Sequence, residues 1–443
     1  MYRVAWIIGA IGLPLSHYWL AATIEPFYSS IYCFLWWSYI FVADFAVFRL
    51  RGTSLLRDRP REFLVLSIWS VPLWLLFEVV NLRIQNWYYV MAPCTFSVGL
   101  IYLVLAFGSV LPGIFETTEL AVGVIEKWVP GSKITGRPFP APGWNVVLQL
   151  LIGAAMLVLL VVFPKSCGCL AWGFAYFLAD PICYWLGRKE PAQAGRSLLG
   201  QLASGDNTRL VALLVAGLVC GGLWEGWNLG ARTKWIYSVP FFDEWKIGEM
   251  PVLGFLGFPP FALECYALVN LLSFFRHGRN WELSAAENRA RRGLPAWGVA
   301  ACALLLPVGI FFAGLATVPT IASFSAPLDW YFQSDLGTQG VAALRGRDAL
   351  QGHQFLKLKD RPPEIDPALW ARLRQIARMG ELKGMGLANA LALEKLKITR
   401  FQDLAKENPA DLASKLNRVG GSVRPEEAKV WIRAAGKQAL EAP

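Results

Sequence analysis

Long, almost uninterrupted apolar segments alternate with short polar connections along most of this chain. A helix needs about 20 apolar residues to cross the hydrocarbon core of a bilayer. Segments of this length are centred on residues 5–24, 30–49, 62–81, 102–125, 145–163, 168–186, 209–228, 251–274 and 296–316. Hydrophobic residues make up 55% of the chain and charged residues only 17%, which excludes an ordinary soluble protein. We therefore predict an all-α polytopic membrane protein with nine spans.

The chain also repeats its own pattern of polar and aromatic residues. The residues that recur in the same order are Asp44, Glu78, Asn81, Trp87, Tyr89, Pro112 and Glu116, and then Asp180, Glu225, Asn228, Trp235, Tyr237, Pro260 and Glu264. A repeat of four spans predicts two copies that cross the bilayer in the same direction and face each other across a central cavity. We place the copies at 1–126 and 145–276, joined by a cytoplasmic linker at 127–144.

Lysine and arginine residues collect in the connections on one side of this arrangement. The three connections richest in them contain Arg49, Arg51, Arg57, Arg59 and Arg61, then Arg188, Lys189, Arg196 and Arg209, and then Arg276, Arg279, Arg289, Arg291 and Arg292. Positive charge is retained in the cytoplasm during membrane insertion. We therefore expect a protein of the bacterial inner membrane, with a cytoplasmic amino terminus and an extracytoplasmic carboxy-terminal domain.

Acidic residues occupy corresponding positions in the two copies. Asp44 and Asp180 lie near the cytoplasmic end of a span, and Glu116 and Glu264 lie near the middle of a later one. An ionised carboxylate at the bilayer centre costs about 2.5–3.5 kcal/mol, so we expect the two glutamates to face inward and to be paired, hydrated or protonated. They are the first candidates for catalytic acids. Asp44 and Asp180 are candidate binding residues, with helix capping or pairing to loop arginines as the alternative.

A second set of polar residues precedes an aromatic pair in each copy. The candidates for catalysis are Glu78 and Glu225, and those for binding are Asn81, Asn228, Trp87, Trp235, Tyr89 and Tyr237. The Glu-x-x-Asn spacing places the acid and the amide on one face of a helix. Alternatively, these acids anchor the Trp and Tyr belt at the membrane interface.

The repeated pattern resembles the membrane-embedded lycopene cyclase domain of bacteria and fungi. The resemblance lies in Glu78, Trp87, Tyr89, Pro112 and Glu116, and in Glu225, Trp235, Tyr237, Pro260 and Glu264, and it covers roughly 30–125 and 165–275. It implies protonation of an isoprenoid polyene by an intramembrane carboxylic acid, followed by ring closure through a carbocation without a metal. The chain departs from the family pattern Pro-x-Glu-Glu, because Thr117 follows Glu116 and Cys265 follows Glu264.

Metal and haem centres have no support in the sequence. The three histidines are scattered and no C-x-x-C-H motif occurs. We expect neither a metal site nor a cofactor, and the ligand we expect is a membrane lipid or an isoprenoid.

The last part of the chain differs from the rest. A basic loop and the ninth span at 277–317 are followed by an expected extracytoplasmic linker at 318–366 and a soluble helical domain at 367–443. Asn408 and Pro409 are typical of a cap and first turn of a helix. The run from Leu382 to Ala390 resembles a helix-hairpin-helix module, in which Gly384 and Gly386 allow a tight turn whose amides can approach phosphate. Because an outside location removes chromosomal DNA, we favour docking of a protein over binding of nucleic acid.

Three functions therefore stay open, and the sequence does not decide whether the chain is an enzyme. The first is an enzyme that acts on a hydrophobic substrate, with Glu116 and Glu264 as acids. The second is a proton- or cation-linked carrier or channel that uses the same acids. The third is a scaffold subunit whose polar pairs lock its helices together and whose outer domain docks a partner.

Overall fold

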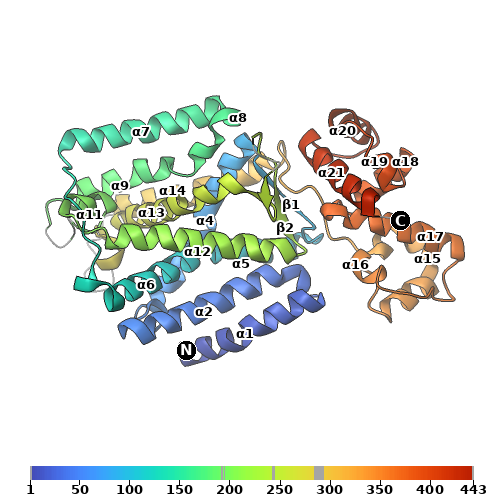
Figure 1. Ribbon diagram of the computed structural model, residues 1–443, viewed down its shortest axis with the longest axis horizontal. Coiled ribbons are helices and arrows are strands. Elements are labelled where there is room, and N and C mark those ends of the chain that lie inside the picture. The colour runs from blue at the N-terminus through green and yellow to red at the C-terminus, as the bar shows by residue number, and fades with distance from the viewer. Residues whose placement is uncertain (1, 191–192, 194, 242–244, 284–293, 442–443) are drawn as a thin grey trace. The chain divides into compact units, whose positions relative to one another are not determined.

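The computed structural model describes residues 2–190, 193, 195–241, 245–283 and 294–441, without the side chains of 283, 294–300 and 441 (Figure 1). Arg289, Arg291 and Arg292, on which the predicted orientation partly rests, lie outside the described residues. The chain forms two compact units. The membrane unit comprises Met1–Asn86, Ile101–Ala231 and Val239–Val318, and the carboxy-terminal unit comprises Trp87–Leu100, Arg232–Ser238 and Pro319–Pro443.

The membrane unit is built from helices. Its helices up to the first long connection are α1 (Tyr2–Ala22), α2 (Ile31–Arg51), α3 (Leu55–Asp58), α4 (Pro60–Ile84), the end of α5 (Phe96–Gly108) and α6 (Val110–Trp128). The helices that follow are α7 (Gly143–Val162), α8 (Pro164–Cys167), α9 (Phe174–Gly187), α11 (Leu198–Ser204), α12 (Thr208–Gly230), α13 (Phe258–His277) and α14 (Leu294–Gly314). Short 3₁₀ segments include η3 (Gly168–Ala171), η4 (Val252–Gly257) and η5 (Trp281–Leu283).

Seven helical segments of the described residues are long and apolar enough to cross a membrane, and a bent pair of helices makes an eighth. The protein is therefore a multi-pass membrane protein, as its composition predicts. The bent pair, Pro164–Ala171 and Phe174–Gly187, turns by 41° where a single span was predicted at 168–186. The segment predicted at 296–316 forms α14, so each of the nine predicted segments contains helix.

The long helices of the membrane unit pack side by side along much of their length (Figure 1). In the first half α2 packs against α1 and α6, and in the second half α9 packs against α7 and α13. Helices α6 and α12 join the two halves, while α14 packs against α4. The outward faces are apolar and exposed, as on α7, which suits contact with lipid tails. The polar residues considered below lie on the inward faces.

The helical run 96–128 is interrupted at Ser109, which separates α5 from α6. Pro112 has no N–H, so it cannot donate to the carbonyl group of Gly108 four residues earlier. Ser70 of α4 supports the break, because its hydroxyl group donates to the carbonyl oxygen of Phe107 and accepts from the N–H of Leu111. A side chain from a neighbouring helix thus provides hydrogen bonds where the helix does not.

The carboxy-terminal unit combines the end of the chain with two short strands from earlier connections. Strand β1 (Trp87–Val90) pairs with β2 (Lys234–Tyr237) in an antiparallel sheet. The helices are α15 (Leu328–Arg345), α16 (Gly352–Phe355), α17 (Pro367–Glu381), α18 (Leu387–Lys395), α19 (Phe401–Leu404), α20 (Pro409–Arg418) and α21 (Pro425–Glu441), with the 3₁₀ turn η6 (Leu382–Gly384) between α17 and α18. Residues 318–366, expected to form a linker, contain α15 and α16 and contribute Phe332 and Phe355 to the core of this unit.

Candidate functional site

Asp44 and Asp180 each cap a short helix that follows the span on which they lie. The carboxyl oxygens of Asp44 accept from the N–H of Leu56 at 2.8 Å and from the hydroxyl group of Ser54 at 2.9 Å. Those of Asp180 accept from the N–H groups of Leu198 and Leu199, at 2.9 and 2.7 Å. Both aspartates are buried. Each therefore satisfies amides at the first turn of a helix, α3 or α11, that have no partner within the helix.

Glu264 of α13 caps a helix of the membrane unit. Its Oε1 atom accepts from the N–H of Ala175 at 2.9 Å, and the amides of Gly173 and Tyr176 lie near its carboxyl group. These amides lie at the start of α9, where the bent pair of helices is broken. A negative charge at a helix amino terminus meets both unsatisfied N–H groups and the positive end of the helix dipole. The side chain of Glu264 thus stabilises the break.

Glu116 of α6 has different surroundings. Neither of its buried carboxyl oxygens receives a hydrogen bond from an N–H or O–H donor within the described residues. The carboxyl group of Asp44 on α2 lies near it. Helix α2 is continuous here, so it offers no free amides of the kind that α9 offers to Glu264. Two carboxyl groups form a hydrogen bond only if one of them carries a proton. We refer to Asp44 and Glu116 as the acid pair.

The helices around Glu116 are in close contact. The hydroxyl group of Thr117, the next residue, lies 2.8 Å from that of Tyr39 on α2 and 3.3 Å from the sulfur of Cys220 on α12. A methyl group added at Gly113 would lie 2.8 Å from the ring of Trp36. The small residue at position 113 therefore lets α6 approach α2 closely beside the acid pair.

Glu78, Asn81, Glu225 and Asn228 are all buried in the membrane unit. Glu78 accepts a hydrogen bond at 3.0 Å from the indole N–H of Trp74, one turn earlier on α4. The side-chain oxygen of Asn81 accepts from the N–H of Asn86 at 3.0 Å, just beyond the end of α4. In α4, therefore, these polar side chains bind groups of their own helix and of its end.

The aromatic residues predicted beside these acids lie together in the carboxy-terminal unit. Trp87 is paired with Tyr237 across the β1–β2 sheet, and Tyr89 is paired with Trp235. The structure thus brings together the four aromatic residues, but in a different unit from Glu78 and Glu225.

An apolar pocket lies between α4, α6 and α13. It has room for about one water molecule, and its lining residues are Ser70, Leu73, Trp74, Phe77, Val110, Leu111, Phe261, Cys265 and Leu268. Pockets that enclose small molecules usually measure about 300–1,000 Å³. The predicted catalytic acids Glu116, Glu264, Glu78 and Glu225 are not among the lining residues. This pocket therefore does not provide the cavity that the duplicated pattern predicted between the glutamates.

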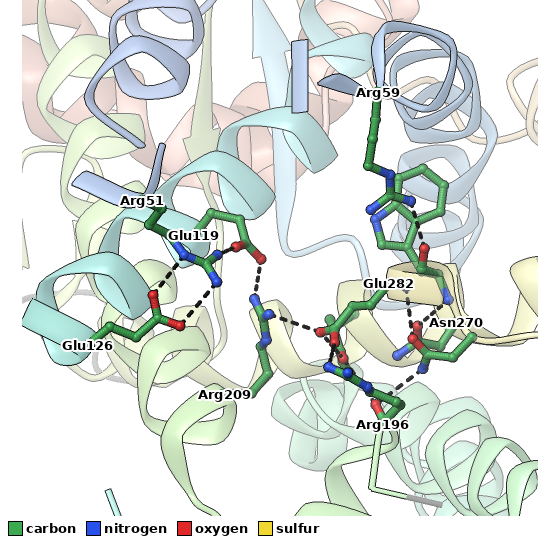
Figure 2. Close-up of polar contacts among 11 residues, drawn as sticks. Arg51, Arg59, Glu119, Glu126, Arg196, Arg209, Asn270 and Glu282 are labelled. Atoms are coloured by element: carbon green, nitrogen blue, oxygen red, sulfur yellow. Dashed lines mark hydrogen bonds and ion pairs between the residues drawn. The ribbon is translucent and has the colours of Figure 1, made fainter. Parts of the chain in front are cut away.

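A network of ion pairs links the two halves of the membrane unit (Figure 2). Arg51 of α2 binds Glu119 and Glu126 of α6, the latter at 2.9 Å. Arg209 of α12 binds both Glu119 and Glu282, the second at 3.0 Å, and its side chain is only 14% exposed. Three arginines and three glutamates form the network, with Arg196 bound to Glu282 at 2.7 Å. Its charges therefore balance.

The segment that contains Glu282 is held by further contacts on the same side of the network (Figure 2). The hydroxyl group of Tyr266 donates to Glu282 at 2.8 Å, and the side-chain oxygen of Asn270 accepts from the N–H of Trp281 at 3.2 Å. Arg59 donates to the carbonyl oxygen of Trp281 at 2.7 Å. Burial alone raises the pKa of Glu282, but Arg209 and Arg196 outweigh it, so the pKa lies below its usual value. Glu282 is therefore ionised at neutral pH.

Sequence reasoning missed the acidic half of this network. Glu119, Glu126 and Glu282 were not singled out, and Arg51, Arg196 and Arg209 were considered only as loop charges that set the orientation. One signal was present: Glu119 follows Glu116 by three residues, which places both on one face of a predicted span. An acid in such a place needs a cation, and the arginines at the ends of α2 and α12 provide it.

The hairpin glycines adopt the backbone conformation that glycine favours. Gly384 and Gly386 have φ values of +67° and +80°. The N–H of Gly386 donates to the carbonyl oxygen of Gly380 at 2.7 Å. A methyl group added at Gly384 would lie 2.6 Å from the side chain of Val90, and one at Gly386 would lie 2.8 Å from Ser323. The turn is thus packed against β1 and the segment at 323 within the carboxy-terminal unit.

Within the part of the chain that the structure describes, no group of three or more His, Cys, Asp or Glu side chains is arranged to hold a metal ion. Comparison with protein-family models, with characterised proteins and with solved structures found no match to this chain.

Proposed function

We propose that this protein is a membrane-anchored scaffold that presents its carboxy-terminal unit to a protein partner. The observation that supports this best is the use of the intramembrane acids within the protein. Asp44, Asp180 and Glu264 each accept hydrogen bonds from helix amides. A catalytic acid needs access to its substrate. These carboxyl groups instead fix the ends of helices.

The duplicated sequence belongs to the same proposal. Ser54 and Ser197, the caps of α3 and α11, each accept a hydrogen bond from an N–H three residues later, and each lies beside an aspartate of the preceding span. The sheet pairs Trp87 with Tyr237 and Tyr89 with Trp235. Two copies related by a two-fold axis exchange contacts in this way. These matches support two parallel copies.

In this proposal the hairpin binds other segments of the carboxy-terminal unit. The hydroxyl group of Ser323 donates to the carbonyl oxygen of Gly384 and accepts from the N–H of Met91 at 2.9 Å. Arg232, which is buried, binds Glu381 at 2.8 Å just before the turn. The turn and the residue just before it thus contact, directly or through Ser323, the segments that follow α4 and α12. Because the carbonyl oxygen of Gly384 and the N–H of Gly386 are both hydrogen bonded within the unit, the hairpin favours protein over nucleic acid as the partner.

The location follows from charge. We infer a bacterial inner membrane, a cytoplasmic amino terminus and an extracytoplasmic carboxy-terminal unit, because the arginine-rich connections share one side of the predicted arrangement. A reporter that fluoresces only in the cytoplasm, fused after Pro443, tests this directly. Fluorescence from that fusion would place the carboxy-terminal unit in the cytoplasm, which is the opposite of the inferred orientation.

A proton-linked function is the second candidate, and the acid pair favours it. Asp44 and Glu116 are buried neighbours, and no N–H or O–H donor of the described residues binds Glu116. Ionisable groups of this kind within spans often belong to proton relays. An enzyme that acts on a polyene is less favoured, because the pocket between α4, α6 and α13 is small and is not lined by the acids.

Purification of the full-length protein from its native membranes in mild detergent separates these functions. If the protein is a scaffold, we expect a protein partner to co-purify with it in a fixed ratio. Binding of this partner should be unchanged in Glu116→Gln and Glu264→Gln and should be lost when residues 361–443 are deleted. Because the deletion disturbs the whole unit, substitutions of exposed residues on α20 and α21 provide a milder test of partner binding. Acid-driven flux in liposomes that disappears in Glu116→Gln would favour the proton-linked function. An isoprenoid product that accumulates only with wild-type protein would overturn the scaffold.

A further inference from the structure

We propose that the carboxy-terminal unit lies on the lipid surface through an aromatic foot formed by Phe96, Phe324, Trp330 and Tyr331. Its partner is the headgroup region of the bilayer on the side where α5 begins. This inference goes beyond the scaffold function, since it holds whether or not the unit also binds a protein. It assigns a role to the exposed aromatic residues that the scaffold function leaves unexplained.

The foot is exposed to an unusual degree for aromatic side chains. Phe96 is 78% exposed, Trp330 59%, Phe324 48% and Tyr331 40%. Among the described residues of this unit, the other large apolar side chains with comparable exposure are Val98 and Leu100, which follow Phe96 on α5, and Leu440 near the end of the chain. Exposed apolar surface therefore gathers in 96–100 and 324–331. Exposed apolar surface that gathers in this way marks a surface that contacts a partner or a membrane.

The two segments of the foot lie next to each other within the unit. Ala92 forms a backbone bridge with Phe324, with hydrogen bonds of 3.0 Å from its N–H to Ser323 and 2.8 Å from the N–H of Ser325. Cys94 lies near the hydroxyl group of Tyr331, whose pKa is raised by burial and further by this thiol. Segment 324–331 is thus fixed beside the residues that lead directly into α5 at Phe96.

The register of α15 explains why its aromatic residues face outward. Leu328 and Phe332, four residues apart, are buried in the core of the unit. Trp330, two residues after Leu328, therefore faces away from the core, whereas Tyr331, three residues after it, lies at the edge of the buried face and is still 40% exposed. The packing of Leu328 and Phe332 in the core thus leaves Trp330 and Tyr331 at the surface of the unit.

The start of α5 indicates where along the chain the surface of the membrane lies. From Phe96 onward α5 is almost entirely apolar, and Ile101 and Val104 are 58% and 47% exposed. In a segment predicted to span the bilayer, such side chains face lipid. The headgroup region must therefore lie close to Phe96. Trp and Tyr are enriched at this depth because their rings are apolar at one end and polar at the other.

A photoactivatable phospholipid tests the proposal on the full-length native protein. The protein is placed in liposomes that contain a phosphatidylcholine with a diazirine near its headgroup, irradiated and digested, and the adducts are mapped by mass spectrometry. We expect adducts on the peptide that contains 324–331 and on α5, where Ile101 serves as the positive control. Leu440, exposed to 88% on α21, serves as the negative control.

The variant Phe324→Ser, Trp330→Ser, Tyr331→Ser completes the test. These side chains are exposed, so we expect the variant to fold, with an unchanged melting temperature in detergent. Its labelling at 324–331 should fall several-fold while labelling of α5 stays the same. Labelling of 324–331 in the wild type no higher than that of Leu440 would overturn the proposal. So would labelling of the variant that equals the wild type.

Discussion

Trp87 of β1 lies directly opposite Tyr237 of β2, and the same pair of residue types recurs with the strands exchanged, where Tyr89 lies opposite Trp235. The two strands come from connections more than a hundred residues apart in sequence, one after α4 and one after α12. Cross-strand aromatic pairs stabilise a short antiparallel sheet. The pairing therefore places corresponding segments of the two proposed copies in one sheet within the carboxy-terminal unit.

Arg209 is the residue whose loss should disturb the ion-pair network most. Its side chain is only 14% exposed, and it binds both Glu119 of α6 and Glu282. In Arg209→Gln both glutamates lose a cation, and removing one partner of a buried pair costs about 3–5 kcal/mol. We expect a large fall in the melting temperature in detergent, followed by tryptophan fluorescence.

The pair Lys133–Asp206 provides the matched control for Arg209. It lies in the same unit at 3.1 Å, but the side chain of Lys133 is 62% exposed. Exposed pairs contribute about 0–1 kcal/mol, so Lys133→Gln should change the melting temperature little. Equal losses in Lys133→Gln and Arg209→Gln would show that the network has no special role in stability.

Glutamine substitutions should distinguish the two mid-span glutamates. Glu264 accepts a hydrogen bond from the N–H of Ala175 at the start of α9, so Glu264→Gln weakens this cap and should cost about 0.5–2 kcal/mol. Glu116 faces the carboxyl group of Asp44, to which a glutamine amide can donate. We therefore expect Glu116→Gln to keep its melting temperature. A larger loss in Glu116→Gln than in Glu264→Gln would contradict the acid pair.

Substitution of Gly384 tests the packing contact between the hairpin and β1. Alanine at a φ of +67° is strained, and its methyl group would also meet Val90 at 2.6 Å. Gly420 also has a positive φ, +96°, but nothing lies within 4 Å of an added methyl group. Gly420→Ala should therefore show only backbone strain, about 1–2 kcal/mol. Gly384→Ala should lower the melting temperature more.

A double variant isolates the contact at Gly384. Val90→Ala removes the methyl group that would lie nearest to an alanine at 384, at 2.6 Å, although its Cβ would still lie at 2.8 Å. It should therefore cost less in the Gly384→Ala background than in the wild type. Additive losses would mean that Val90 and the hairpin do not interact.

The sequence predicted well those features that depend on local chemistry. Apolar length predicted helical segments, and the pair Asn408–Pro409 predicted the start of α20, where Asn408 accepts hydrogen bonds from the N–H groups of Ala410 and Asp411. The helix-capping alternative for Asp44 and Asp180 agrees with their contacts, although the amides they bind lie 12 and 18 residues further along the chain.

Features that depend on distant contacts did not follow from the sequence. The break before Phe174 is stabilised by Glu264, which lies far along the chain, and hydropathy does not detect such a break. Pairing between β1 and β2 is likewise non-local. Gly337 and Gly346 indicated irregular structure in 318–366, although buried Phe332 and Phe355 anchor helices there. In each case, packing between remote segments overrides the local pattern.

His353 makes the stability of the carboxy-terminal unit dependent on pH. Burial, together with the nearby charges of Arg232 and Lys357, lowers the pKa of His353 from 6.5 to about 3. In the unfolded chain the pKa stays near its usual value, so between these limits the unfolded state binds the extra proton. The stability due to neutral His353 is therefore present above pH 6.5 and is lost as the pH falls toward 3. We expect the melting temperature to fall over this range, and to fall less in His353→Gln.

Lys357→Gln refines the prediction for His353. It removes one of the charges that lower the pKa of the histidine, so the loss of stability on acidification should become smaller, but not as small as in His353→Gln. Measurements between pH 6.5 and about 5 separate the histidine from the carboxyl groups, most of which titrate at lower pH. If wild type and His353→Gln lose the same number of degrees in that interval, His353 is not the group that senses acid.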